Sequence, residues 1–370
     1  MLSKNLAHCV QRHLAYSNFH KSGNYEWDSV QGLVALKPDA TRRLAVWSML
    51  IQGVHFVLQI GSLLFNTERL EVAQVGEATC LIAINFSAFM LRLDLYGDHA
   101  PVQVINFLIK KEDIEPTKSE KTLSILVIAF CYIMEVTYWI FPLGLGLFTI
   151  IFPCKPPLLS ALFFSPEECG AGPALQFKII FSLVEFIIAR QAVMSGGYYA
   201  VFILLPSVIY LWTELAKISD VLANFDVFKT TYEKLRVFET ALNSATAGRI
   251  FKTIALVFPF NQIEISFTCI KLHQSGDVNL GKLAFFLLTY LDFLAFCLLV
   301  FTATAKINTL SKKRISQFGR KIKSKVDKKV MRGMSPLRIK FGDNFVEAIT
   351  PLIIQEFCIR QLISLLIVSG

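Results

Sequence analysis

Three acidic side chains stand inside long apolar stretches of this sequence, where an unpaired charge is expensive. Glu135, Glu185 and Asp292 are each surrounded by Leu, Ile, Phe and Val residues. A charged side chain at the centre of a bilayer costs roughly 2.5–3.5 kcal/mol even on a lenient scale. These carboxylates therefore either pair with a base, for which Arg190 and Lys178 are candidates, or bind a cationic or hydroxyl-rich ligand.

A fourth acid lies near the end of the chain, in its last apolar stretch. Glu356 precedes Arg360 by four residues, so the two side chains share one face of a helix. They either neutralise each other or line a water-filled path, in which Glu356 would attract cations. The neighbouring amides Gln355 and Gln361 are further candidates for a pore or a contact between subunits.

The composition explains why these polar residues stand out. Apolar residues make up 54% of the 370 residues and charged residues 18%, and the mean hydropathy is +0.52. Soluble chains carry roughly 45–50% apolar and about 25% charged residues. The length would suit two or three soluble domains, but this composition excludes them, together with disorder, a coiled coil and a disulfide-built secreted domain. It indicates an all-α polytopic membrane protein.

Seven stretches are long and apolar enough to cross a membrane, which takes about 20 residues. They are Leu44–Phe65, Gly76–Leu95, Thr122–Phe152, Leu175–Lys217, Ile250–Ile270, Leu283–Ala305 and Asn344–Gly370. The fourth stretch is about twice as long as one crossing needs. Either Gly196 and Gly197 turn it into two spans, or one helix crosses and continues into the cytosol.

Basic residues orient the spans, because Lys and Arg near span ends stay on the cytosolic side. Of the 37 basic residues, 29 lie before the first span and in every second loop, against four in the alternate loops. The amino terminus is therefore predicted in the cytosol and the carboxyl terminus outside, with the fourth stretch as a single crossing. A G-protein-coupled receptor has the opposite orientation, so no G protein is expected as a partner.

Thirteen of the basic residues lie in one loop, between Lys306 and Lys340. Apolar residues recur within it at i, i+3, i+7 and i+11, which predicts a helix with one apolar stripe. The residues of the stripe are Ile315, Phe318, Ile322 and Val326. The helix could pack against the cytosolic part of the fourth span or bind anionic membrane lipid. Nucleic-acid binding is not expected, because only Phe318 interleaves the charges.

Two stretches carry a resemblance to a known family. One contains Gly172-Pro173, Phe177, Gln191 and Trp212-Thr-Glu-Leu, and the other runs Met331-Arg-Gly-Met-Ser-Pro-Leu-Arg-Ile-Lys-Phe-Gly342 before the last span. With the seven-span layout, they resemble the insect-type gustatory and odorant receptors. Gustatory receptors commonly carry Thr-Tyr and Gln-Phe pairs in the last helix. Leu362-Ile363 and Ser369-Gly370 stand there in this chain, which indicates a divergent branch.

The resemblance implies a function. The chain would be a gustatory-type chemoreceptor subunit of a tetrameric, ligand-gated, non-selective cation channel in the plasma membrane of sensory neurons. The tetramer would be a homotetramer or would include related subunits. A small-molecule tastant (a sugar, an amine or a bitter compound) would open it. An odorant-receptor-type channel subunit and a secondary transporter are the alternatives.

The resemblance also implies where ligand binds. Family members hold ligand among the outer halves of spans two, three, four and six, beside aromatic walls with a few polar groups. The matching candidates here are Glu135, Tyr138, Trp139, Phe181, Glu185, Phe286, Tyr290 and Asp292.

The family's pore lies between the last helices of four subunits. Leu362, Leu366 and Ser369 share one helical face, and by its offset from Gly342, Leu366 falls at the family's hydrophobic gate. Gln355 and Glu356 complete the predicted pore residues. In the predicted outer loop, Cys154 and Cys169 could form a disulfide.

The domain organisation follows from these assignments. Residues 1–43 form a cytosolic segment, and 44–305 hold spans one to six with a cytosolic extension at about 212–250. Residues 306–343 form the basic helix and a glycine turn, and 344–370 the pore helix.

An enzyme is not expected, nor is a cofactor or metal. The seven-span zinc hydrolases need an intramembrane histidine cluster, whereas only His55 lies within a span. A transporter built from paired repeats does not suit an odd number of spans.

Overall fold

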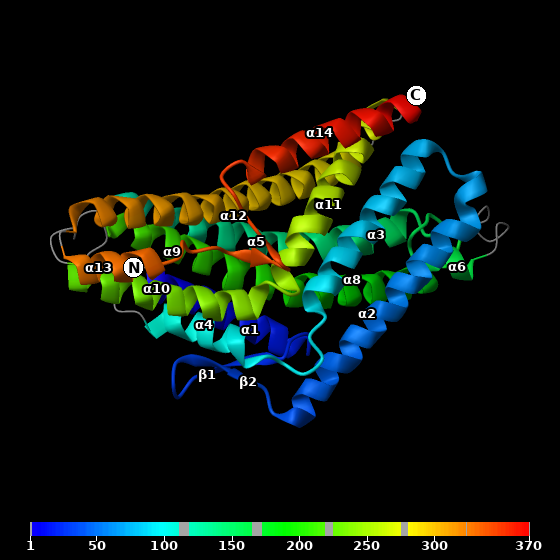
Figure 1. Cartoon of the computed structure of the whole chain (residues 1–370). Coiled ribbons are helices and arrows are strands. Elements are labelled where there is room, and N and C mark those ends of the chain that lie inside the picture. The colour runs from blue at the N-terminus through cyan, green and yellow to red at the C-terminus, as the bar shows by residue number, and fades with distance from the viewer. Residues whose placement is uncertain are drawn as a thin grey trace.

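The chain folds into a bundle of long helices that run side by side. The computed structural model describes residues 2–110, 118–164, 172–218, 225–274, 280–322 and 324–369. The marked ends of the chain lie at opposite ends of the bundle (Figure 1). The helices are α1 (Leu2–Phe19), α2 (Asp39–Asn66), α3 (Val72–Arg92), α4 (His99–Lys110), α5 (Lys118–Ile151), α6 (Ser160–Phe163), α8 (Leu175–Gly197), α9 (Leu205–Lys217), α10 (Phe225–Thr246), α11 (Ile250–Gln274), α12 (Leu280–Lys321), α13 (Lys325–Gly333) and α14 (Thr350–Val368).

Shorter elements join these helices. A 3-10 turn, η1 (Thr67–Arg69), follows α2, and a π-helical stretch, η2 (Tyr198–Leu204), joins α8 to α9. Two antiparallel hairpins are formed by β1 (Tyr25–Asp28) with β2 (Leu33–Leu36) and by β3 (Lys340–Phe341) with β4 (Asn344–Phe345).

The predicted all-α, seven-span class is confirmed. Within the described residues, seven helical segments are long and apolar enough to cross a membrane, and each overlaps one predicted stretch. They are α2, α3, α5, the continuous run α8–η2–α9, α11, α12 and α14. The chain is therefore a multi-pass membrane protein. Which side of the membrane each terminus faces stays a prediction.

The fourth span is one continuous helical run and not a hairpin. It extends over 43 residues from Leu175 to Lys217. Gly196 and Gly197 lie inside it without a turn. A side chain at position 197 would collide with the hydroxyl of Tyr138 on α5. Glycine is therefore needed here for the close approach of two helices and not for a reversal of the chain.

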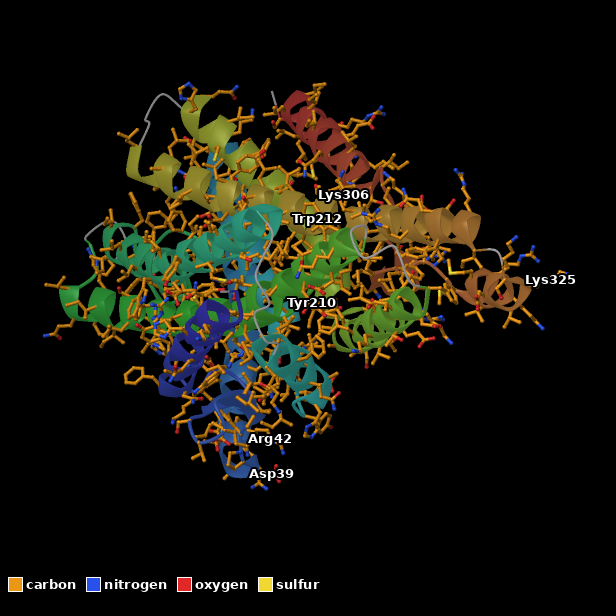
Figure 2. All side chains as sticks on the ribbon, turned by 90° about the vertical axis from the view of Figure 1, so that its left-hand side faces the viewer. Asp39, Arg42, Tyr210, Trp212, Lys306 and Lys325 are labelled. Carbon is orange, nitrogen blue, oxygen red and sulfur yellow. The ribbon has the colours of Figure 1, made fainter. Side chains whose placement is uncertain are left out.

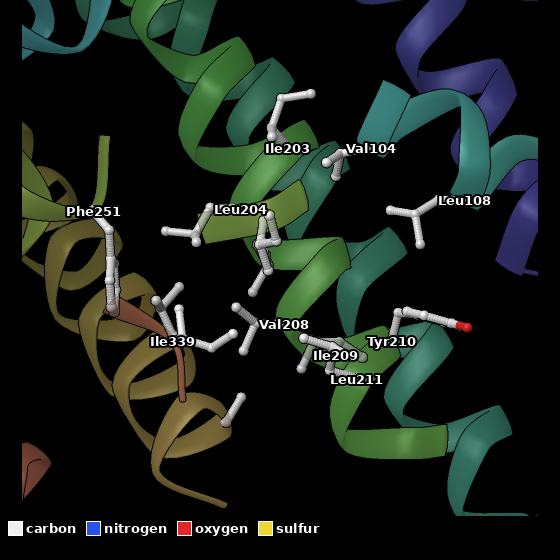
Figure 3. Packing of buried hydrophobic residues seen from close by; sticks show 14 of the residues in the cluster. Val104, Leu108, Ile203, Leu204, Val208, Ile209, Tyr210, Leu211, Phe251 and Ile339 are labelled. Carbon is white, nitrogen blue, oxygen red and sulfur yellow. The ribbon is translucent and has the colours of Figure 1, made fainter. Parts of the chain in front are cut away.

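This run forms the centre of the bundle. From Tyr198 to Leu211 every side chain is buried. Figure 3 shows Ile203 and Val208 in the middle of this packing, with Val104 of α4 on one side and Phe251 of α11 on the other. A helix that is apolar on all its sides has to be surrounded by other helices, and the sequence of this run meets that condition.

The amino-terminal helix α1 packs against the bundle, and the cytosolic location expected for residues 1–43 stays a prediction. Its buried apolar residues Leu6, Val10 and Leu14 join the main core. Beyond them, Arg12 contacts Glu135 of α5 with a nitrogen–oxygen distance of 2.6 Å. His13 is buried among aromatic rings, and this burial lowers its pKa to about 4, so the imidazole is neutral at pH 7.

The sequence predicted one helix in the basic loop, but the structure has two helical parts there. The first part of the loop continues the sixth span as α12, which ends at Lys321, and its second part is α13. Phe318 is buried against Phe228 of α10, with ring centroids 3.8 Å apart, whereas Val326 is 72% exposed. The helix breaks after Lys321, so the apolar stripe does not continue to Val326.

The predicted contact with the fourth span is present. The guanidinium of Arg314 donates hydrogen bonds to the carbonyls of Leu215 and Ala216 at the end of α9. In Figure 2, which looks onto this end of the bundle, Lys306 and Trp212 lie near the centre and Lys325 at the outer edge. The basic residues of α13 therefore face away from the packed interior.

The linker 334–346 between α13 and α14 is held in place by side chains of α10 and α12. Tyr232, Glu239 and Asn243 of α10 and Ser311 of α12 each bond its backbone. The Gly342 amide donates to the Ala247 carbonyl at 2.8 Å. Burial raises the pKa of the Glu239 carboxyl above its ordinary value. An extended segment whose backbone groups are satisfied in this way is fixed relative to α10.

Gly342 begins the two-residue turn of the β3–β4 hairpin with φ +59°, a left-handed conformation that disfavours a side chain. We expect Gly342→Ala to destabilise the protein by roughly 1–2 kcal/mol, measured as a lower melting temperature of the detergent-purified protein. Gly319→Ala is the matched control, because it lies within helix α12 with open space around the added methyl group. Equal melting temperatures for the two variants would contradict the expectation.

Candidate functional site

A cavity of about 110 Å³ lies among α3, α5, α8, η2, α11 and α12. On each of α3, α5, α8–η2 and α12 the lining residues follow the spacing i, i+3, i+4, i+7, which is one face of a helix. The lining residues of α5 are Met134, Thr137, Tyr138 and Phe141, and those of α12 are Thr289, Asp292, Phe293 and Phe296. The cavity is therefore a gap between four helix faces.

The cavity lies towards the carboxyl-terminal end of α3 and of α8, which the predicted orientation assigns to the inner halves of these spans. In α3 its lining begins at Ile84 and ends at Leu91, one residue before the helix ends. In the fourth span it begins at Val193, beyond the first 18 residues of α8. Gly196 and Gly197 lie on this face, where the missing side chains let Ala88 of α3 and Tyr138 of α5 approach the fourth span.

The polar groups of the cavity are few. The Thr137 hydroxyl donates to Asp292 Oδ2 at 2.7 Å, and Asn261 donates to the Ser87 hydroxyl oxygen at 2.6 Å. The Tyr138 hydroxyl oxygen is buried and makes no hydrogen bond within the described part of the chain. Phenylalanine rings and aliphatic side chains form most of the remaining wall. Such a site suits a small, largely apolar molecule with one polar group.

Two of the eight predicted ligand residues, Tyr138 and Asp292, line this cavity. Glu135 and Trp139, which are on α5 with Tyr138, do not line the cavity because they lie on a different face of that helix. Glu135 bonds to Arg12 of α1 through both carboxylate oxygens, at 2.8 and 2.6 Å. The ring of Trp139 lies 3.2 Å below the guanidinium carbon of Arg190. In the structure, Glu135 and Trp139 therefore each contact an arginine of the chain and do not face the cavity.

The other four predicted ligand residues are also outside the cavity. Phe181 packs against Phe163 and Phe164 near the short helix α6. Phe286 is fully buried in a second apolar cluster, and Tyr290 packs against that cluster. Binding of ligand by any of the eight residues stays a prediction.

Glu185 belongs to a buried chain of hydrogen bonds between α2, α3 and α8. One carboxylate oxygen contacts His55 Nε2 at 2.9 Å, and the other accepts from the Leu159 amide at 2.8 Å. The chain continues from His55 through Asn85 and Gln52 to Arg92. The sequence had suggested Arg190 or Lys178 as partners of the acids; the structure pairs Glu135 with Arg12 and Glu185 with His55.

The last span, α14, packs on α11 through a short polar seam. Gln355 donates to the amide oxygen of Gln262 at 3.4 Å, and Cys358 Sγ lies 3.6 Å from that oxygen and from the Pro259 carbonyl. The predicted pore residues Leu362, Leu366 and Ser369 are half-buried on this same side of the helix.

The opposite face of α14 is free in the single chain. Glu356 and Arg360 lie on it, both exposed, and their side chains pair at 2.6 Å, which is one of the two arrangements foreseen for them. The pore and gate assignment concerns several chains and stays a prediction.

Cys154 is disulfide-bonded, and its predicted partner Cys169 lies outside the described residues. Within the described part of the chain, no group of three or more His, Cys, Asp or Glu side chains could hold a metal ion.

Comparison with known proteins adds one finding. No family model and no curated protein matches the sequence. Two solved structures of the insect olfactory receptor OR5 from Machilis hrabei are similar in fold. The complex with eugenol matches with a TM-score of 0.67 at 12% identity, over 99% of both chains. The second structure of that receptor matches with 0.59 at 12% identity, over 96% of both chains. At this identity the likeness shows the fold.

The hydrogen bonds of Glu185 predict a structural role for this residue. We expect Glu185→Ala to destabilise the protein by roughly 3–5 kcal/mol, because His55 and the Leu159 amide lose their buried partner. The measurement is thermal unfolding of the purified protein. Asp39→Ala, which removes one side of an exposed pair with Arg42, should change stability little. A Glu185 variant as stable as the Asp39 variant would contradict the assignment.

Proposed function

We propose that the chain is a chemoreceptor subunit that forms, with further copies or related subunits, a ligand-gated cation channel opened by a small molecule. The observation that carries the proposal is the agreement in fold with an insect olfactory receptor over 99% of both chains. The agreement includes the long fourth span and the terminal helix α14, which the sequence resemblance had singled out. The site and the free helix face add support from the chain itself.

The cavity supports ligand binding within each subunit. It lies among spans two, three, four and six, with span five contributing Phe258. Its wall is apolar and aromatic with a few polar groups, as small-molecule sites are. The similar olfactory receptor was solved in complex with eugenol, a small molecule.

Side-chain contacts of α11 connect the cavity lining to α14. Gln262 of α11 donates to the carbonyl of Phe293, which lines the cavity, at 3.3 Å. The same side chain accepts from Gln355 of α14 through its oxygen. The cavity residue Phe258 directly precedes Pro259, whose carbonyl faces Cys358 of α14. A ligand that moves the cavity wall would thereby shift the contacts that hold α14.

The free face of α14 supports an assembly around this helix. Leu352 and Ile367 are about three-quarters exposed on a span that is otherwise apolar. Glu356 and Arg360 are exposed on the same helix, and such a pair suits a water-filled path or a subunit contact better than lipid. We therefore propose that the α14 helices of four subunits surround the pore. Of the proposed pore residues, Glu356 lies on the free face, whereas Gln355, Leu362, Leu366 and Ser369 lie on the side that packs on α11 in the single chain.

The sequence and the similar structures favour different types of chemoreceptor. The sequence resemblance favours a gustatory receptor, while the similar solved structures are olfactory receptors. An odorant-type subunit is therefore an equal second candidate. Ligand panels of tastants and of volatile compounds on cells that express the full chain would separate the two types.

Filling the cavity should abolish activation. Ala88 lines the cavity from α3, so we expect Ala88→Phe to remove ligand-evoked current because the added ring takes the ligand's place. The measurement is whole-cell current, with surface expression followed by an epitope tag. Ile82→Phe introduces the same ring on α3 outside the cavity lining and should leave the current intact. A normal response from surface-expressed Ala88→Phe would rule the cavity out as the ligand site.

Leu366 and the adjacent Ile367 lie on different faces of α14, so substitutions at these two positions test which face closes the pore. If Leu366 closes the pore, Leu366→Ala should raise the ligand-free current, because a shorter side chain lets water into the constriction. Ile367→Ala, on the free face, is the matched control and should leave the basal current low. The reverse pattern would move the gate to the free face of α14. The measurement is the current before and after a pore blocker.

A further inference from the structure

Some carboxylates of the seven spans have a basic side chain within ion-pair distance and others do not. Eight acids lie in these segments, and for six of them the structure gives a cationic or imidazole partner. The six pairs are Asp39 with Arg42, Glu77 with Lys155 and Lys282, Glu135 with Arg12, Glu185 with His55, Glu214 with Lys217, and Glu356 with Arg360. Asp292 and Glu264 have no described base within 4.0 Å.

Of these two, Asp292 lines the cavity and Glu264 does not. The partner of Asp292 is the Thr137 hydroxyl, which donates to one carboxylate oxygen. No Lys, Arg or His is among the residues that line the cavity. An ionised carboxylate in an apolar cavity with one hydroxyl donor is costly unless a cation joins it. The charge that would balance Asp292 is therefore missing from the residues that the structure describes around it.

The walls around Asp292 suit a cation that carries an apolar body. Tyr138, Phe141, Phe293 and Phe296 present aromatic rings to the cavity, and the faces of such rings attract ammonium groups. The buried Tyr138 hydroxyl oxygen, which makes no hydrogen bond within the described residues, is a second acceptor for an N–H group. The volume of about 110 Å³ is comparable with the roughly 150 Å³ cavity that holds one benzene ring.

We propose that the cavity binds a small protonated amine, with its ammonium group at Asp292 and a body of one ring or a short chain against the phenylalanine rings. This inference rests on the proposed function and names its ligand class. It distinguishes an amine from the sugars and neutral compounds that the sequence left open. The ammonium donates to the oxygen of Asp292 that Thr137 does not occupy, so one ligand group completes the site.

The test compares amines with neutral molecules of the same shape. Cells that express the full chain are recorded with benzylamine and cyclohexylamine, and with benzyl alcohol and cyclohexanol. We expect each amine to act at a concentration about 10- to 100-fold lower than its alcohol, the range that one charge-assisted hydrogen bond supplies. Asp292→Asn should remove this preference, because the amines lose their charged partner and then act only at concentrations similar to those of the alcohols, with surface expression followed by an epitope tag.

Glu264→Gln is the matched control, because it neutralises the other unpaired carboxylate without touching the cavity. It should keep the preference for amines. Equal potency of amine and alcohol in the unmodified chain would overturn the inference, as would an Asp292→Asn variant that still prefers amines. Activation by the alcohols alone would leave the proposed channel standing and exclude the amine as its ligand.

A binding measurement keeps the two proposals separable. Benzylamine should raise the melting temperature of the purified full chain and of Glu264→Gln, but not that of Asp292→Asn. Stabilisation without any current would support the amine site while the channel proposal fails. No stabilisation of the unmodified chain by either amine would overturn the amine site, whatever the currents show.

Discussion

The arrangement of the bundle depends on the close packing of one helix that is surrounded on all sides. Lipid gives helices no hydrophobic reason to associate, so contact between small residues and good packing have to hold them together. In this chain the requirement falls on the fourth span, where the run from Tyr198 to Leu211 is buried throughout. Gly197 lets the Tyr138 hydroxyl of α5 approach, and Gly196 lets Ala88 of α3 approach. The same two glycines line the cavity, so the features that allow close packing also shape the site.

The spans were predictable because a helix that crosses the hydrocarbon core must have about 20 mainly apolar residues, and such stretches can be read from the sequence. The residues predicted to bind ligand do not all lie on the cavity-facing sides of their helices. The predicted set took Glu135 and Trp139 with Tyr138, whereas the cavity uses Met134, Thr137 and Phe141 with it. A search for i, i+3, i+4, i+7 sets with small and polar members would have found that face. The partner of Glu135 could not be found in this way, because Arg12 comes from a segment 123 residues away that the charge pattern assigned to the cytosol.

Polar contacts inside the bundle fall into two groups with different consequences. The hydrogen bonds from Glu185 through His55 to Arg92 satisfy one another, so they fix the relative positions of α2, α3 and α8. The contacts of Gln262 are longer and join three helices: α11 and α12, which both line the cavity, and α14. Longer and weaker bonds at a junction are easier to exchange than a satisfied network. The contacts of Gln262 therefore connect α14 to the cavity wall, whereas the Glu185 network connects α2, α3 and α8.

Helix α12 has a mechanical consequence that follows from its length. It is continuous over 42 residues, and it carries Asp292 in the cavity and Phe318 against Phe228 of α10. At roughly 1.5 Å per residue these two positions are about 39 Å apart along one rod. Because Phe318 holds one end of the helix, a sideways push at Asp292 acts as on a lever whose fulcrum is at Phe318. The displacement then grows towards Leu280, so a small shift at Asp292 becomes a larger one at the far end of the helix.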